Sequence, residues 1–323
     1  MPPKNLESLR RTSIRFKQEC TAVQPGLAVL LYTTAELDRA TTAAADILEA
    51  YLTFVPDGSI KAIYHIGENE YSSGFVPFDA AARNQLLYDL RRGPVLIDED
   101  GYDFVLSATM DGQAGQYGCR FRGTTIPDPD DFPDETSLIR LEFPWDYLDT
   151  VDVDIFVGFV KDVAELYPFC TGHAGMSFIN TIVYEPAARA EIAKLVPRFL
   201  GFDCAYDWTY VYMRGKVPPA HWIQLLDLVT VERLGGENRL KQALQGCEIH
   251  DLSQGLLVRG AKYPPVGDVN RLALDIGLLP AVAKVLAPVR YDEPNELGLG
   301  SDTAGKAYLR RFDERKSRDW NND

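Results

Sequence analysis

The chain has 323 residues, of which 46% are hydrophobic and 25% are charged, a composition typical of a globular protein. Its formal net charge of −14 argues against a nucleic-acid-binding or membrane-surface protein, because a strongly acidic chain repels phosphate groups. The five cysteines form no C-x-x-C pair, which is typical of reduced thiols in a cytosolic protein. The N-terminal residues lack the apolar core of a secretory signal, and no apolar run approaches the ~20 residues that cross a bilayer, so we expect a cytoplasmic protein.

Strand and helix patterns alternate in the first half of the chain. The apolar spacing predicts strands at residues 27–33, 60–66, 102–109 and 117–126, and helices at residues 37–55 and after Asp79. Pro56, Asp57 and Gly58 end the first helix, and Asp79 caps the second. The last two strands are expected to form a hairpin.

Residues 127–135 (PDPDDFPDE) hold three prolines and five acids, which predicts a loop and a subdomain boundary near 127–136. After it, the pattern predicts strands at residues 138–143, 175–184 and 207–214, and helices at 152–167, 187–199, 219–229, 269–286 and 303–315. The order of elements is loosely repeated in both halves, which suggests a pseudo-duplication. We expect a single domain over residues 1–323 of the α+β (mixed α/β) class, with antiparallel sheets and packed helices.

The sequence offers no local template for catalysis or for metal binding. The four histidines do not pair at i, i+4, and a metal site would need ligands from distant segments: His65, His173, His221 and His250. His173 lies close to Ser177, which leaves a hydrolase as an alternative, but the G-x-S-x-G elbow is absent. The ordinary interpretation is a histidine hydrogen-bonded to backbone at the start of a strand. We therefore expect no catalytic residue, cofactor or metal.

Residues 300–307 (GSDTAGKA) almost match the phosphate-binding loop G-x-x-x-x-G-K-[ST]. Ala307 replaces the hydroxyl that holds Mg²⁺, and Asp302 would place a negative charge inside a cradle for anions. No strand precedes the segment. We expect a helix capped by Asp302, and no nucleotide binding.

Two acidic stretches are the candidate binding surface. Runs of like charge are usually solvated loops, and the alternative is a surface that imitates phosphate and docks on a basic partner. The residues concerned are Asp98, Glu99, Asp100, Asp128, Asp130, Asp131, Asp134 and Glu135.

Several short motifs follow one another in a familiar order. They are residues 172–175 (GHAG), 201–203 (GFD), 221–226 (HWIQLL), 231–236 (VERLGG), 255–260 (GLLVRG), 266–270 (VGDVN) and 286–290 (LAPVR). Over about residues 20–315 the chain resembles the type VI secretion immunity family. Such motifs have structural causes: Gly235 and Gly236, for example, permit a tight turn after a helix.

The resemblance implies an immunity protein that binds a cognate type VI effector toxin and blocks it by stoichiometric occlusion, without being an enzyme. The net charge of −14 favours a basic toxin, and a cytoplasmic nuclease in the first place. In such families the partner surface is expected to differ between members, so the motif residues mark the scaffold. An effector-loading adaptor and the hydrolase built on His173 and Ser177 stay open as alternatives.

Overall fold

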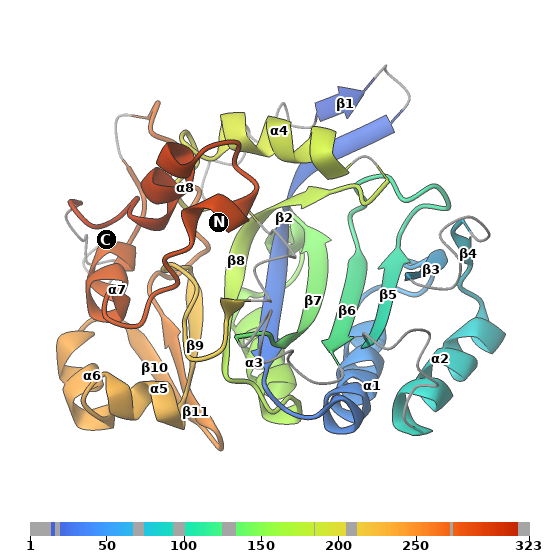
Figure 1. The fold of residues 1–323 in the computed structure, drawn as a ribbon, viewed down its shortest axis with the longest axis horizontal. Helices are drawn as coiled ribbons and strands as arrows, with labels where there is room; N and C mark the ends of the chain where they lie inside the picture. Colours follow the sequence, from blue (N-terminus) through green and yellow to red (C-terminus); the bar gives the residue numbers. More distant parts are fainter. Residues whose placement is uncertain are drawn as a thin grey trace.

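The computed structural model describes residues 14–16, 20–66, 74–92, 101–124, 134–183, 185–204, 212–271 and 274–315. These residues form one 11-stranded sheet with the order β10-β11-β9-β8-β2-β7-β6-β5-β3-β4, and β1 pairs with β2 (Figure 1). Neighbouring strands are antiparallel throughout this order. The predicted α+β class with antiparallel pairing is confirmed.

The elements have the following bounds. The strands are β1 Ile14–Phe16, β2 Cys20–Thr33, β3 Ala62–Ile66, β4 Val76–Pro77, β5 Gly101–Ser107, β6 Gly118–Thr124, β7 Ser137–Pro144, β8 Thr171–Asn180, β9 Ile223–Asp227, β10 Glu248–Leu252 and β11 Gly255–Arg259. The α-helices are α1 Leu37–Phe54, α2 Ala80–Arg92, α3 Val153–Leu166, α4 Glu185–Leu195, α5 Leu228–Arg233, α6 Glu237–Ala243, α7 Leu279–Leu286 and α8 Asp302–Leu309. Two 3₁₀ helices, η2 Tyr147–Asp149 and η4 Pro294–Leu297, complete the described elements.

One face of the sheet packs against α1 and α3. Helix α1 lies on β6 and β7, and α2 and α3 flank it (Figure 1). Because side chains alternate along a strand, Leu27, Val29 and Leu31 of β2 point to one face together, and all three are buried. The ring of Phe143 on β7 meets that of Phe156 on α3 edge to face, with centroids 5.2 Å apart. This apolar face forms the larger core.

The opposite face of the sheet carries apolar side chains in one part and polar side chains in another. Over β9 and β11 it is apolar, because Leu226 and Val258 pack with Leu279 and Val282 of the α7 segment in a second core. From β9 towards β6, the residues that lie opposite one another on this face of neighbouring strands are Gln224, His173, Leu30, Arg140 and Arg120. Polar residues therefore line this face beside the second core.

The two halves of the chain share this sheet. Strand β2 from the first half lies between β7 and β8 from the second half. Strands β6 and β7, on either side of residues 127–136, pair with each other. A subdomain boundary near residues 127–136 stays a prediction.

The local signals of the first half are confirmed. Helix α1 ends at Phe54, just before Pro56. The side chain of Asp79 accepts a hydrogen bond from the Ala82 N–H of α2 at 2.9 Å, as a cap does. Strands β5 and β6 form the expected hairpin.

Three predictions in the second half are wrong. Residues 219–229 are not a helix: β9 occupies Ile223–Asp227 and α5 follows, because the strand is buried on both faces and lacks the alternation that marks a strand. Helix α7 begins only at Leu279, since Gly277 with φ of 52° breaks the run expected from residue 269. Residues 212–214 of the strand expected at 207–214 are not a strand, and residues 207–211 lie outside the described residues.

The cap of α8 is also one residue away from the expected position. Ser301, not Asp302, is the N-cap, and its Oγ accepts a hydrogen bond from the Ala304 N–H at 3.1 Å. Asp302 is the first helical residue and pairs with Lys306 at 2.6 Å. Among the described residues, no helix is long and apolar enough to span a bilayer.

Candidate functional site

The acidic stretches lie mostly beyond the described part of the chain. Asp98, Glu99, Asp100, Asp128, Asp130 and Asp131 are outside the described residues. Asp134 and Glu135 lie directly before β7 and are half-buried. The Arg214 N–H donates to the Asp134 carbonyl at 2.9 Å, so the backbone of Asp134 is fixed to the C-terminal half of the chain.

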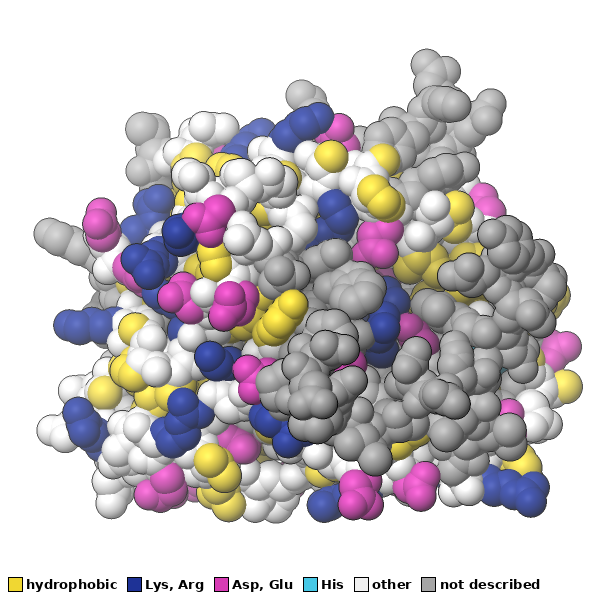
Figure 2. All heavy atoms as spheres, viewed as in Figure 1, with side chains coloured by type: hydrophobic (Ala, Val, Ile, Leu, Met, Phe, Trp, Pro, Cys, Tyr) yellow, Lys and Arg dark blue, Asp and Glu magenta, His cyan; other side chains and the backbone are white. Residues whose placement is uncertain are grey.

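Charges of both signs are mixed over the face of the molecule that Figure 2 shows. Figure 2 shows acidic and basic side chains interspersed on the visible face, without one large patch of a single sign among the coloured residues. The excess of negative charge in the sequence is therefore not gathered in one described patch of this face.

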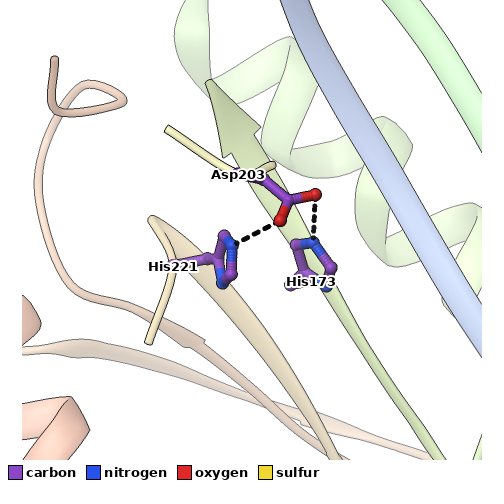
Figure 3. Close-up of side chains that lie close together, drawn as sticks. All are labelled: His173, Asp203 and His221. Atoms are coloured by element: carbon purple, nitrogen blue, oxygen red, sulfur yellow. Dashed lines mark hydrogen bonds and ion pairs between the residues drawn. The ribbon is translucent and has the colours of Figure 1, made fainter. Parts of the chain in front are cut away.

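Three polar side chains from separate segments meet in the interior. His173 comes from β8, Asp203 follows the turn after α4, and His221 precedes β9 (Figure 3). The Asp203 carboxylate faces both imidazoles: Oδ2 lies 3.1 Å from His173 Nε2, and Oδ1 lies 3.3 Å from His221 Nε2. The imidazole centroids are 4.0 Å apart. We call these three residues the His-Asp-His cluster.

Backbone pairing places the carboxylate. The Asp203 N–H donates to the Met176 carbonyl at 2.8 Å, and the Phe178 N–H donates to the Asp203 carbonyl at 3.2 Å, so Asp203 extends the edge of β8. Tyr308 of α8 donates its O–H to Asp203 Oδ1 at 3.0 Å. The buried Arg311 connects the carbonyls of Leu200 and Ala220, which lie near Asp203 and His221 in the chain.

Each histidine of the cluster has a distinct environment. The Pro219 carbonyl lies 2.5 Å from His221 Nδ1 and can only accept a hydrogen bond, so Nδ1 carries the proton. His221 Nε2 is close to Asp203 but outside hydrogen-bonding geometry. His173 Nε2 makes its hydrogen bond to Asp203, and its Nδ1 has no hydrogen-bond partner.

Burial and mutual interactions both shift the pKa values of the cluster. His173, Asp203 and His221 are 2%, 6% and 1% exposed. Burial opposes ionisation of Asp203, but His173 and His221 outweigh it and hold the pKa of that carboxyl well below its usual range. Burial, and then His173, lower the pKa of His221 to about 3. Burial also raises the pKa of the Tyr308 phenol.

The cluster escaped sequence reasoning because its members lie far apart. We expected no metal site, since no local motif supplies ligands. Yet His173, Asp203 and His221 are the potential metal-binding group found among the described residues, with their ligand atoms within 4.8 Å of one another. The available signal was that each residue belongs to a different one of the motifs GHAG, GFD and HWIQLL.

The structure also places the two other segments that the sequence singled out, around Ser177 and around Lys306. Ser177 is fully buried, and its Oγ makes no hydrogen bond, so no base activates it. Lys306, the lysine of the loop-like segment GSDTAGKA, turns back on its own helix and pairs with Asp302. The arrangement that best fits a ligand is thus the His-Asp-His cluster.

A solved structure shares the fold of this chain. The Pseudomonas aeruginosa T6SS protein PA0821 is similar in structure, with a TM-score of 0.75 and 16% sequence identity over 98% of this chain and 92% of that chain. At this identity the likeness shows a shared fold. No curated protein sequence matches the chain.

The family follows from the sequence match. The family TsiV, described as "Type VI immunity for VRR-NUC", matches residues 50–322, which is most of the chain. The chain belongs to this family of type VI immunity proteins, and the resemblance seen in the motifs is confirmed.

Proposed function

We propose that this chain binds the VRR-NUC nuclease domain of a cognate type VI effector and blocks it by stoichiometric occlusion. The observation that carries the proposal is the family match over residues 50–322, because the family is described by immunity to VRR-NUC. The chain would act by binding and not by chemistry.

The charge of the chain supports this mode of action. A nuclease must attract phosphate and therefore presents a basic groove, which a protein of net charge −14 attracts in turn. Charges at the rim of an interface mainly raise the association rate, while desolvated contacts set the dissociation rate. The acidic stretches at residues 98–100 and 128–135 are the proposed steering surface.

The hydrolase alternative finds no support in the geometry. A nucleophile must reach its substrate, whereas Ser177 is 0% exposed and His173 is 2% exposed. The adaptor alternative differs from immunity in its outcome, because an adaptor binds an effector without inhibiting it.

The proposal is tested by binding to the effector encoded in the neighbouring open reading frame. The two proteins should co-purify, and the association rate should fall as salt rises to physiological strength, where screening acts beyond about 8 Å. Replacing Asp128, Asp130, Asp131 and Asp134 by asparagine should lower the association rate and flatten its salt dependence.

A control variant separates local steering from overall charge. Asp57→Asn, Asp149→Asn, Glu232→Gln and Glu293→Gln together remove the same charge from exposed positions on other segments. This control should keep an association rate close to that of the parent. Equal slowing in both variants would refute a specific role for the loop, and failure of the two proteins to associate would refute the function.

A further inference from the structure

The His-Asp-His cluster has one contact, between His221 and Asp203, in which two hydrogen-bond acceptors face each other without a donor between them. His221 donates Nδ1–H to the Pro219 carbonyl, so the neutral ring presents a lone pair at Nε2. That lone pair faces Asp203 Oδ1 at 3.3 Å, and this oxygen is also an acceptor that already receives the Tyr308 O–H. Two buried acceptors that face each other call for a cation between them, which is either an added proton or a metal ion.

The distances fit a shared metal ion. A zinc ion with bonds of about 2.0–2.2 Å and tetrahedral angles holds its ligand atoms roughly 3.3–3.6 Å apart. The two nitrogen–oxygen distances in the cluster, 3.1 Å to Asp203 Oδ2 and 3.3 Å to Oδ1, are close to this separation. Because they end on different oxygens of one carboxylate, the ion would lie in front of that carboxylate, where all the ligand atoms are within 4.8 Å of one another. The donor set of two imidazoles and one carboxylate is one that zinc and related divalent metals prefer.

The outer contacts are those of a metal site. Histidine ligands commonly donate their second ring N–H to a backbone carbonyl, which fixes the tautomer, and His221 does so to Pro219. Ligating carboxylates are themselves hydrogen-bonded, and Asp203 receives the Tyr308 O–H. Two of the three ligands are thus oriented before any ion binds.

We propose that His173, Asp203 and His221 bind one divalent transition metal ion, zinc in the first place, at the buried junction of β8, the turn after α4 and the segment before β9. The three ligands are at most 6% exposed, so the ion holds the fold together and does not act on a substrate. Three protein ligands leave a further coordination position for a water molecule. The inference is independent of the effector that the chain binds.

The proposal is tested with zinc itself on the full chain. After treatment with a chelator, the protein should bind one equivalent of Zn²⁺ in calorimetry, and its melting temperature should rise. Co²⁺ in place of zinc should give the visible absorption of a tetrahedral site in the parent protein, a result that needs no variant.

Matched variants locate the ion. Asp203→Asn and His221→Gln should weaken zinc binding by at least about 100-fold, and Tyr308→Phe, which keeps all three ligands, by about 10-fold or more. His250→Gln is the control, because His250 lies on edge strand β10 beside Glu248 and should leave the affinity within about twofold.

Three results would overturn the proposal. They are the absence of a one-equivalent zinc site and of Co²⁺ absorption in the parent, unchanged affinity in Asp203→Asn and His221→Gln, and loss of binding in His250→Gln alone. Each of these results would mean that the cluster is a buried hydrogen-bond network in which a proton, and not a metal ion, lies between His221 and Asp203.

Discussion

Tyr308 connects the C-terminal helix to the sheet through one hydroxyl group. The side chain is 3% exposed, its O–H donates to Asp203 Oδ1 at 3.0 Å, and its oxygen accepts the Cys204 N–H at 3.4 Å. Tyr308→Phe removes this oxygen and keeps the ring, so it measures the hydrogen bonds and little else. A hydrogen bond to a charged group contributes about 1.5–3 kcal/mol, and the longer amide contact adds less. We expect a loss of about 2–3 kcal/mol in the free energy of unfolding.

The assay is urea unfolding, with parent and variant treated with chelator in the same way. With an unfolding entropy of about 2.1 cal/mol/K per residue, a 323-residue chain should lose roughly 3–4 °C in melting temperature. Tyr263→Phe is the control, because that hydroxyl makes no hydrogen bond to any of the described residues, and it should change stability by less than about 0.5 kcal/mol. A Tyr308→Phe variant as stable as this control would show that the hydroxyl does not stabilise the fold.

Further predictions concern single sites. In Gly201→Ala the new Cβ would lie 1.9 Å from the Pro265 carbonyl oxygen, so the variant should lose about 3 kcal/mol in the free energy of unfolding, measured in urea. In Gly158→Ala the new Cβ would meet no described atom within 4 Å beyond its chain neighbours and the backbone of its own helix, so this variant should gain up to about 1 kcal/mol. A Gly201→Ala variant more stable than Gly158→Ala would contradict the packing seen at these two glycines. Ser301→Ala should cost about 1 kcal/mol through the lost cap, and an unchanged midpoint would show that the cap is dispensable. Ser177→Ala should leave protection of cells from the effector intact, and loss of protection with unchanged stability and effector binding would revive the hydrolase alternative.

The elements predicted correctly are those whose signals are local. Helix α1 has apolar residues at helical spacing and a proline stop, and α2 has the cap that Asp79 supplies. The sequence pattern predicts a helix where β9 lies, because a strand that is buried on both faces has no alternation of apolar and polar residues. A short apolar run of this kind cannot be distinguished from a buried helix. The type of fold was therefore easier to predict than the elements at its centre.

The candidate site depended on contacts that sequence spacing does not encode. His173 and Asp203 are 30 residues apart, and they meet only because Asp203 pairs with the edge of β8. The helix after the loop-like segment GSDTAGKA could be predicted from the sequence, but the choice between Ser301 and Asp302 as its cap required backbone geometry. The absence of nucleotide binding at this segment stays a prediction. The sequence shows that Asp134 and Glu135 belong to an acidic stretch, but their role in binding stays a prediction.

Stoichiometric inhibition of a VRR-NUC effector by this chain is tested most directly by one titration. Nuclease activity of the cognate effector on DNA is measured while the purified chain is added in steps. Occlusion predicts that activity falls in proportion to the added chain and reaches zero near one equivalent. Activity that persists at several-fold excess despite binding would indicate an adaptor, and loss of activity far below one equivalent would indicate an enzyme; either result would contradict the proposed function.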